Sequence, residues 1–334
     1  MGQKSNPSEA VGVVVIGRNE GERLKRCLTS LLNSTRSIVY VDSGSSDDSV
    51  AMSRSLGVEV VDLDLRTPFT AARARNEGLW HLVRMRPGPD LEYVFFVDGD
   101  CEVLEGWVDV ATGFLDGRPD VAAVSGRLRE RYPEKSVYNL LCDIEWESFP
   151  IGEAKACGGL AVMRIDALRQ VNGFRPDLIC GEEPELCVRL RQKGWRIWQL
   201  KTDMALHDAG LYHFSQWWKR MLRGGYAYAQ GASEHGAPPE QHWVEESRRI
   251  WGWGLVIPVA ILLLALSLDL RLLWLLAIYP LQVIRLAVRG TRSRRQNWVR
   301  ALALVLCKFP EMLGQLKFLM DKHRRVQSSL IEYK

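Results

Sequence analysis

The sequence predicts an α/β fold with a mostly parallel sheet, followed by a helical region that associates with a membrane. Short strands of β-branched and aromatic residues alternate with helical patterns through the first third of the chain. Apart from Glu59, these strands are apolar along their whole length, which is typical of parallel sheets that are covered by helices on both faces. Two long apolar runs after Trp251 predict the membrane region.

Strands and helices are expected in strict alternation at the start of the chain. The strands are predicted at residues 11–16, 38–41, 58–61 and 93–97. The first helix carries apolar residues at helical spacing between Leu24 and Leu32, and Asn19 is expected to cap it, with Glu22 three residues later. Weaker helical patterns cover residues 47–56 and 71–83.

Composition limits the class of protein. The 334 residues, of which 47% are hydrophobic, are enough for a full core and a second region. A net charge of +4 does not demand a nucleic-acid partner. The seven cysteines form no Cys-x-x-Cys pair, which favours reduced thiols in the cytosol over a disulfide framework. Residues 1–10 are polar and do not resemble a signal peptide.

Polar residues follow three of the four predicted strands. Arg18 and Asn19 follow the first, Asp42 follows the second, and Asp98 and Asp100 follow the fourth. Because open parallel sheets bind ligands beyond the carboxyl ends of their strands, we expect these residues to share one site. Two aspartates beside a glycine are also ordinary turn residues, so a solvated turn is the alternative. As a pair of oxygen ligands they indicate a site for Mg²⁺ or Mn²⁺.

Two further clusters lie downstream. Gly158 and Gly159 precede a short apolar run and allow backbone to approach a ligand closely, although a β-bulge or turn explains them equally well. Glu182 and Glu183 are expected, with Pro184, in the first turn of a helix, where the helix dipole favours carboxylates. The dipole alone accounts for this placement, and a catalytic role is the alternative.

Seven segments in this order resemble motifs of the family 2 glycosyltransferases of GT-A fold. They are VVVIGRNEGERLKRCLTSLL, VDSGSSDDS, ARARNEG, VDGD, CGG, GEEPELCVRL and ALHDAG, and the resemblance covers about residues 11–230. Two positions depart from the family pattern: Ser43 replaces an aspartate of the nucleotide-contacting segment, and Glu183 stands where the family usually has an aspartate. The stretch QWWKR does not reproduce the Gln-x-x-Arg-Trp motif of processive synthases, so processive polymerisation is not supported.

The resemblance implies an inverting, metal-dependent enzyme that moves a sugar from a nucleotide-diphosphate sugar to a hydroxyl acceptor. The expected membrane location favours a role in cell-envelope polysaccharide or lipid-linked glycan synthesis. Glu183 would be the catalytic base, with Glu182 as its rival. The metal ligands would be Asp98, Asp100 and His207. The donor would be bound by Arg18, Asn19, Asp42, Arg75 and Asp98, with Arg75 near its phosphates and Asp98 near its ribose. The loop on the acceptor side would be formed by Gly158 and Gly159.

The last third of the chain predicts a membrane hairpin. Residues 251–268 reach roughly 27 Å as a helix, just short of a 30 Å hydrocarbon core, and a second apolar run ends at Val288. Arg248 and Arg249 precede the hairpin, and arginines at residues 292–295 follow it, which places both ends in the cytoplasm. Residues 298–320 predict an interfacial helix pair broken at Pro310. The alternative for this whole region is a buried helical subdomain.

The expected organisation is therefore a polar tail at residues 1–10, a GT-A domain at 11–235, a linker at 236–250 and a membrane region at 251–334. The catalytic domain would face the cytoplasm from the cell membrane and act on a lipid-linked or saccharide acceptor. Residues 215–231, rich in aromatic and basic side chains, could bind acceptor phosphate, although a packing helix is the alternative. Two other functions stay open: a metal-dependent sugar nucleotidyltransferase, and a membrane scaffold that binds nucleotide sugars without turnover.

Overall fold

A computed structural model describes residues 10–35, 37–85 and 91–325, so the predicted polar tail lies almost wholly outside the described residues. Contacts divide the chain into two compact units. The first comprises the described residues up to Arg131 together with Trp146–Ala209, and the second comprises Tyr132–Glu145 and the described residues from Gly210 onward. This division falls before the predicted domain end at residue 235, because helix α8 (Phe214–His235) packs against helix α13 (Lys308–Arg324).

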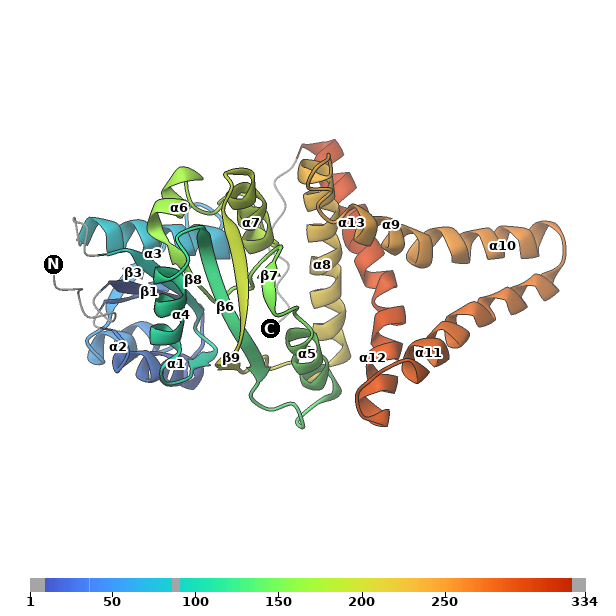
Figure 1. Ribbon diagram of the computed structural model, residues 1–334. Coiled ribbons are helices and arrows are strands. Elements are labelled where there is room, and N and C mark those ends of the chain that lie inside the picture. The colour runs from blue at the N-terminus through green and yellow to red at the C-terminus, as the bar shows by residue number, and fades with distance from the viewer. Residues whose placement is uncertain (1–9, 36, 86–90, 326–334) are drawn as a thin grey trace. The chain divides into compact units, whose positions relative to one another are not determined.

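A nine-stranded sheet forms the centre of the first unit, as far as the described residues show (Figure 1). Its strands are β1 (Val11–Gly17), β2 (Ile38–Asp42), β3 (Glu59–Asp62), β4 (Tyr93–Asp98), β5 (Cys101–Val103), β6 (Val121–Glu130), β7 (Gly152–Ala154), β8 (Ala161–Arg164) and β9 (Arg196–His207). Their order across the sheet is β3-β2-β1-β4-β8-β6-β9-β5, and β7 pairs with β9. The four strands predicted from the sequence are therefore confirmed, and they lie side by side.

The predicted parallel pairing holds for these four strands. The pairs β1–β2, β1–β4 and β2–β3 are parallel, and β6–β9 adds a further parallel pair. Beyond β4 the sheet is mixed, since β8 runs antiparallel to both β4 and β6, and the short strands β5 and β7 run antiparallel to β9. The carboxyl ends of β1, β2 and β4 consequently meet at one edge of the sheet.

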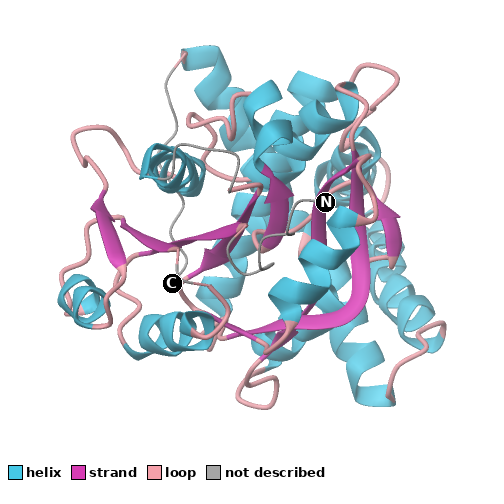
Figure 2. Cartoon of the chain, turned by 60° about the vertical axis from the view of Figure 1, so that its left-hand side comes forward, coloured by secondary structure: helices cyan, strands magenta, loops and turns pink. Residues whose placement is uncertain are grey.

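Helices cover both faces of this sheet (Figure 2). They are α1 (Glu22–Leu32), α2 (Ser49–Ser55), α3 (Ala71–Met85), α4 (Trp107–Asp116), α6 (Ile165–Gln170) and α7 (Glu182–Gln192). Alternate residues of β1 serve opposite faces: Val13 packs in the cluster with α1 and α4, and Val14 packs in the cluster with α3, α6 and α7. The uniformly apolar strands are thus explained by burial on two sides.

The start of α1 differs from the prediction. Gly21 is its N-cap residue and makes no side-chain capping bond, so Asn19 is not the cap. Asn19 instead adopts a left-handed conformation with φ of 55°, and its side-chain oxygen accepts a hydrogen bond from the backbone amide of Ser46 at 2.7 Å. Asparagine tolerates this conformation better than most residues. Asn19 therefore connects the loop after β1 to the loop after β2 and does not cap α1.

The second unit is helical. Helix α5 (Val137–Glu147) begins in this unit, which also contains α8, α9 (Val244–Trp251), a π-helical segment (Gly252–Val256), α10 (Ile257–Ser267), a 3₁₀ segment (Leu270–Ala277), α11 (Ile278–Val288), α12 (Arg294–Leu306) and α13. Helix α9 occupies part of the predicted linker. The predicted helix pair is present, but its break lies at Cys307 rather than Pro310, since proline is tolerated in the first turn of α13.

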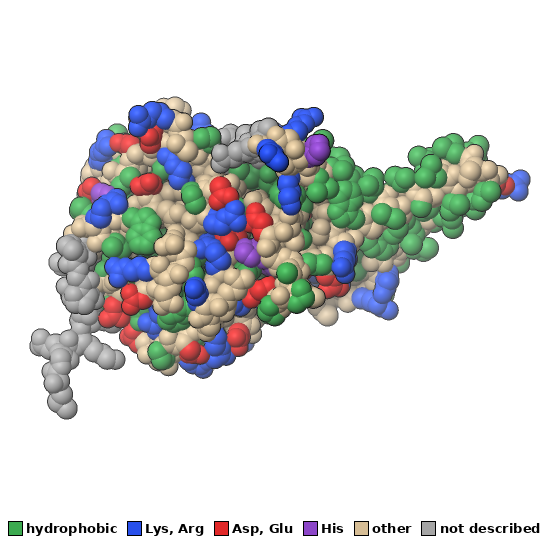
Figure 3. Space-filling view, turned by 90° about the horizontal axis from the view of Figure 1, so that it is seen from above, with side chains coloured by type: hydrophobic (Ala, Val, Ile, Leu, Met, Phe, Trp, Pro, Cys, Tyr) green, Lys and Arg blue, Asp and Glu red, His purple; other side chains and the backbone are tan. Residues whose placement is uncertain are grey.

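Helices α10 and α11 form an apolar hairpin (Figures 1 and 3). Two continuous helices, Val244–Ser267 and Leu270–Val288, are long and apolar enough to cross a membrane by length and composition. Large apolar side chains are exposed along them, and Trp274 is 82% exposed. Such exposure does not fit a buried helical subdomain, because monomeric soluble proteins rarely expose apolar patches of this extent.

Candidate active site

The carboxyl-terminal edge of β1, β2 and β4 gathers the polar residues that the sequence singled out. At this edge β1 ends at Gly17, β2 ends at Asp42 and β4 ends at Asp98. Ile16 pairs with Asp98 and Gly17 pairs with Asp42 across the parallel ladders. The predicted common position of these clusters therefore follows directly from the strand register.

Asp42 is a buried residue that organises its own loop. Its two carboxylate oxygens accept hydrogen bonds from the hydroxyl of Tyr40 at 2.7 Å, from the amides of Gly44 and Ser45 at 2.9 and 2.8 Å, and from the hydroxyl of Ser45 at 2.5 Å. Four donors nearly fill the acceptor capacity of a carboxylate. Asp42 shapes the loop after β2 in this structure, and a contact with a nucleotide would have to share these oxygens.

Arg18 and Asn19 lie beside that loop. The backbone amide of Asn19 donates to the hydroxyl of Ser45 at 2.9 Å, which joins the loop after β1 to the loop after β2. The guanidinium of Arg18 lies over the ring of Phe69, 4.9 Å from its centroid, and the side chain is exposed at the surface. Both residues therefore line the rim where a donor is expected.

Arg75 is the centre of a buried charge cluster. This arginine on α3 is only 3% exposed, and it pairs with three carboxylates: Asp98 at 2.9 Å, Glu182 at 2.9 Å and Glu183 at 2.8 Å. Asp98 ends β4 and the two glutamates begin α7, so one side chain joins three elements. The sequence predicted contact with donor phosphate, but the structure places this guanidinium among carboxylates. Their charges outweigh burial, which acts in the opposite direction, and raise the pKa of Arg75.

Glu183 is the carboxylate of this cluster with a clearly altered acidity. Burial is the largest cause and, with the negative charges of Glu182 and Asp98, raises the pKa of Glu183 to about 7, although Arg75 lowers it. Its side chain is still 15% exposed, compared with 5% for Glu182. A carboxylate whose pKa lies near neutral pH and which is reachable from solvent is suited to accept a proton.

Gly159 closes the loop over this cluster. A Cβ atom at this position would lie 2.9 Å from Arg75 Nη2, 2.9 Å from Asp98 Oδ2 and 3.2 Å from Glu183 Oε1, so the cluster leaves no space for a side chain. Gly158 has open space around it. The thiol of Cys157 contacts that of Cys187 on α7 at 3.5 Å, which connects this loop to the helix that carries Glu183. Gly159 is thus explained by a close approach to charged side chains, whereas no neighbour requires a glycine at position 158.

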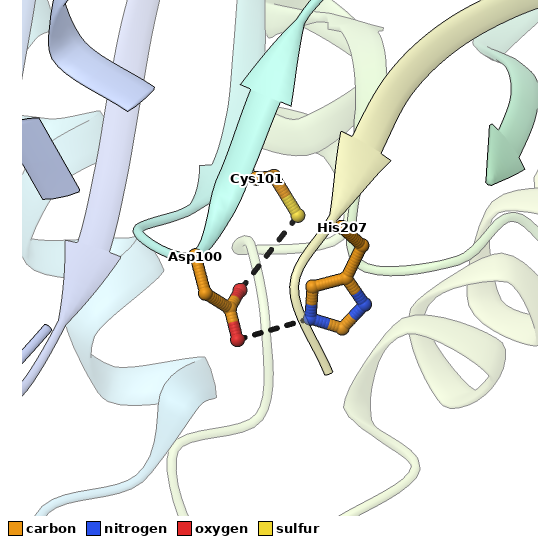
Figure 4. Close-up of side chains that lie close together, drawn as sticks. All are labelled: Asp100, Cys101 and His207. Carbon is orange, nitrogen blue, oxygen red and sulfur yellow. Dashed lines mark hydrogen bonds and ion pairs between the residues drawn. The ribbon is translucent and has the colours of Figure 1, made fainter. Parts of the chain in front are cut away.

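Asp100 and His207 form a second group beside the cluster (Figure 4). His207 Nε2 lies 3.0 Å from Asp100 Oδ2, and ligand atoms of Asp100, Cys101 and His207 lie within 4.8 Å of one another. The antiparallel pairing of β5 with β9 creates this group, because Cys101 is the register partner of His207. Asp98, also predicted as a ligand, is not among these three residues, and its Oδ1 pairs with Arg75 at 2.9 Å.

The residues of this second group fit a divalent cation. Carboxylate and imidazole groups are common ligands of such ions. His207 Nε2 and Asp100 Oδ2 also face one another at 3.0 Å, so both groups present a ligand atom toward the same point. Asp100 and His207 are the residues that would hold the ion, and Cys101 lies within reach.

Sequence reasoning missed three neighbours of this site. The ring of Trp146 packs on His207 with 4.6 Å between centroids, and Arg26 pairs with Asp208 at 3.3 Å. Cys101 was also missed, although its position directly after Asp100 was a signal that could have found it. Trp146 and Arg26 carried no such signal, because only the tertiary structure brings them to β9.

Comparisons with known proteins identify the fold. Residues 12–171 match Glycosyl transferase family 2. The sequence is 30% identical to a pre-mycofactocin glycosyltransferase of Mycobacterium tuberculosis over 227 residues, which are 61% of this chain and 44% of that protein. The chain therefore spans less than half the length of this relative. A segment of 54 residues, 16% of this chain and 19% of the relative, is 39% identical to an uncharacterized glycosyltransferase of Rickettsia conorii.

A solved structure agrees with the family match. The mannosyltransferase of Pyrobaculum calidifontis, in complex with GDP-mannose and Mn²⁺, has a TM-score of 0.65 at 20% identity and covers 94% of this chain and 88% of that chain. At this identity the likeness shows the fold alone. Residues 12–171 are therefore similar to glycosyl transferase family 2, and the strand order and this likeness show that the chain has the GT-A fold.

Proposed function

We propose that this chain is an inverting glycosyltransferase that depends on a divalent cation, and that it transfers a sugar from a nucleoside-diphosphate sugar to a hydroxyl group of an acceptor at a membrane surface. The observation that carries the proposal is the pair of adjacent groups at the sheet edge. One is the Arg75 cluster, which contains a carboxylate with a pKa of about 7, and the other is the Asp100–His207 pair.

The donor would bind over the loops after β1, β2 and β4, with Arg18 and Asn19 on its nucleotide side. A divalent cation held by Asp100 and His207 would offset the negative charge that develops on the departing diphosphate. Asp98, expected as a further ligand, would contact the donor from its place beside Arg75. Arg75 would act as a positioning residue that holds Asp98 and both glutamates in place.

Glu183 would take the proton from the acceptor hydroxyl. Its carboxylate is less buried than that of Glu182, and Gly158 leaves open space on the loop that is expected on the acceptor side. The acceptor oxygen would attack the anomeric carbon on the face opposite the leaving diphosphate, so the configuration at that carbon would invert. The acceptor proton would pass to Glu183, and the nucleoside diphosphate would leave.

The apolar hairpin supports a membrane acceptor. An enzyme that is anchored by α10 and α11 would meet a lipid-linked or envelope polysaccharide acceptor on the same surface. Arginines flank the hairpin at both ends, which supports a cytoplasmic catalytic unit. Sugar transfer in cell-envelope or lipid-linked glycan synthesis is the role that this placement favours.

Donor turnover tests the function. The purified chain would be incubated with guanosine and uridine diphosphate sugars, GDP-mannose first because the Pyrobaculum enzyme was solved with it, and with membrane extract as the source of acceptor. We expect release of nucleoside diphosphate that depends on both the cation and the extract. Release of pyrophosphate from a nucleoside triphosphate would instead indicate a nucleotidyltransferase, and binding without turnover would indicate a scaffold.

Asp100→Asn should abolish cation-dependent binding of the donor nucleotide. The substitution keeps the size of the side chain but removes the negative charge. Loss of a metal ligand lowers the affinity for the ion much more than loss of a surface charge does. Isothermal calorimetry with and without Mn²⁺ measures the difference. Asp109→Asn, an exposed position on α4, is the matched control. Unchanged cation dependence in Asp100→Asn would remove Asp100 from the ion site.

The protein should remain with the membrane fraction after a wash with 1 M salt, a concentration at which electrostatic attraction is screened within about 3 Å. Burial of the exposed apolar side chains of α10 and α11 in lipid does not depend on ionic strength. Immunoblots of the pellet and supernatant measure the distribution. Complete release into the supernatant would show that attachment is electrostatic and peripheral.

A further inference from the structure

A pocket lies where the hairpin meets the rest of the second unit. It has a volume of about 360 Å³ and is lined by Ala287, Val288, Arg292, Arg294, Asn297 and Trp298, and we call it the basic pocket. It lies between the end of α11 and the start of α12. None of its residues belongs to the sugar-transfer site.

The chain builds this pocket with a tightly held loop. The side-chain oxygen of Asn297 accepts from the amide of Arg292 at 3.1 Å, and its nitrogen donates to the carbonyls of Gly290 and Arg292 at 3.0 and 2.9 Å. The hydroxyl of Ser293 caps α12 by accepting from the amide of Gln296. The backbone that carries Arg292 and Arg294 is therefore fixed independently of their side chains.

The charged residues in the sequence from 270 to 310 are all basic. No acidic residue occurs in the sequence between Asp269 and Glu311, whereas seven arginines do. Arg294 and Arg295 occupy the first turn of α12, where the helix dipole disfavours cations, so helix stability does not account for them. Guanidinium groups bind phosphate with paired hydrogen bonds, so a phosphate group is the complementary ligand.

The other side of the pocket is apolar and continues onto the hairpin. Val288 is 75% exposed and Trp298 is 42% exposed, and Leu281 and Ile284 extend the exposed apolar surface along α11. Tryptophan is favoured at the boundary between the hydrocarbon and the headgroups of a bilayer. A ligand that matches both sides has a phosphate at one end and hydrocarbon at the other.

We propose that the basic pocket binds the headgroup phosphate of an anionic phospholipid, with the acyl chains lying against α11. The proposal rests on the membrane placement in the proposed function, and it adds a lipid site that is separate from the acceptor site. Arg292 and Arg294 hold the phosphate, and Trp298 and Val288 contact the glycerol and the first part of the chains. Basic pockets beside membrane helices on the cytoplasmic side recognise anionic headgroups in this way.

Thermal unfolding of the full chain in a neutral detergent tests this site, because a micelle of neutral detergent has almost no surface potential. Short-chain phosphatidylglycerol, short-chain phosphatidylcholine and inorganic phosphate would each be titrated at low mole fraction. A ligand that binds the native state raises the unfolding temperature. We expect a saturable rise with phosphatidylglycerol and none with the other two compounds.

Two double variants distinguish binding in the basic pocket from non-specific electrostatic attraction. In Arg292→Gln/Arg294→Gln the half-saturating lipid concentration should rise about tenfold or more, the usual worth of a charged hydrogen bond. Arg289→Gln/Arg295→Gln removes the same charge beside the pocket and should change that concentration less than about threefold. Arg294→Gln alone, at an exposed position, serves if the first double variant does not fold.

If both double variants lost lipid affinity equally, the lipid would be attracted by the overall positive charge and would not bind specifically in the basic pocket. Equal stabilisation by inorganic phosphate would overturn the lipid as its ligand, and no rise with phosphatidylglycerol would overturn the site altogether. Sedimentation of the same proteins with phosphatidylcholine vesicles tests the hairpin, and donor turnover tests the enzyme. Failure of the lipid site is therefore distinguishable from failure of the proposed function.

Discussion

Glu183→Gln should lower turnover by about 10²- to 10⁴-fold and leave donor affinity nearly unchanged, since this is the usual contribution of a general base. Glutamine keeps the size of the side chain and its capacity for hydrogen bonds, but it cannot take a proton from the acceptor. Steady-state release of nucleoside diphosphate gives turnover, and calorimetric titration gives donor affinity. Glu182→Gln is the matched control, because Glu182 contacts the same arginine but is more buried.

The pH dependence of turnover is an independent test of Glu183. Glu183 accepts a proton only when it is ionised, and its pKa is raised to about 7, chiefly by burial. The rate of the native enzyme should therefore rise with pH through about 7 and then level off, and this rise should be absent in Glu183→Gln. If Glu182→Gln loses turnover and Glu183→Gln does not, their roles are exchanged. If neither variant loses turnover, the base is elsewhere.

Arg75→Met should lower the free energy of unfolding by about 3–5 kcal/mol at pH 8, the cost of removing one partner from a buried ion pair. The substitution leaves Asp98, Glu182 and Glu183 close together without a cation. Denaturant unfolding followed by circular dichroism measures the loss. Arg84→Met, at an exposed position on the same helix, should change stability by less than about 0.5 kcal/mol.

The stability loss in Arg75→Met should become smaller as the pH falls. Arg75 lowers the pKa of Glu183, so its removal raises that pKa above about 7, while the unfolded value stays near 4.5. Between about 7 and this raised pKa the folded variant still holds a proton that the native protein has released, so only the variant loses stability as pH rises. Below about 7 Glu183 is protonated in both folded proteins, and their stabilities change alike. Adding Glu182→Gln should restore part of the loss. A variant equally unstable at pH 5 and pH 8 would show that Arg75 acts through packing rather than charge.

The first half of the sheet was predictable because its signals are local. Each of β1, β2 and β4 is a largely apolar run, β3 has two apolar residues between Glu59 and Asp62, and α1 buries the stripe of Leu24, Cys27, Leu28 and Leu31 that the periodicity indicates. The later strands β5, β7 and β8 were not predicted, because they contain only three or four residues each. A segment this short has no period that distinguishes it from a turn. Strands β6 and β9, with 10 and 12 residues, were also missed, and their length does not explain it.

The sequence by itself determined the fold class, the edge of the sheet that carries the polar loops, and the apolar hairpin, since each depends on residues that are close in the chain. The tertiary structure alone decided which of these residues meet. Arg75 reaches Asp98 across 23 residues and Glu182 across 107, and Asp100 meets His207 because Cys101 pairs with His207 in an antiparallel ladder. The physical reason is that local periodicity indicates only which face of an element is buried. Strand register and helix packing decide which distant charged residues lie together in one buried space. Burial and the neighbouring carboxylates there raise the pKa of Glu183.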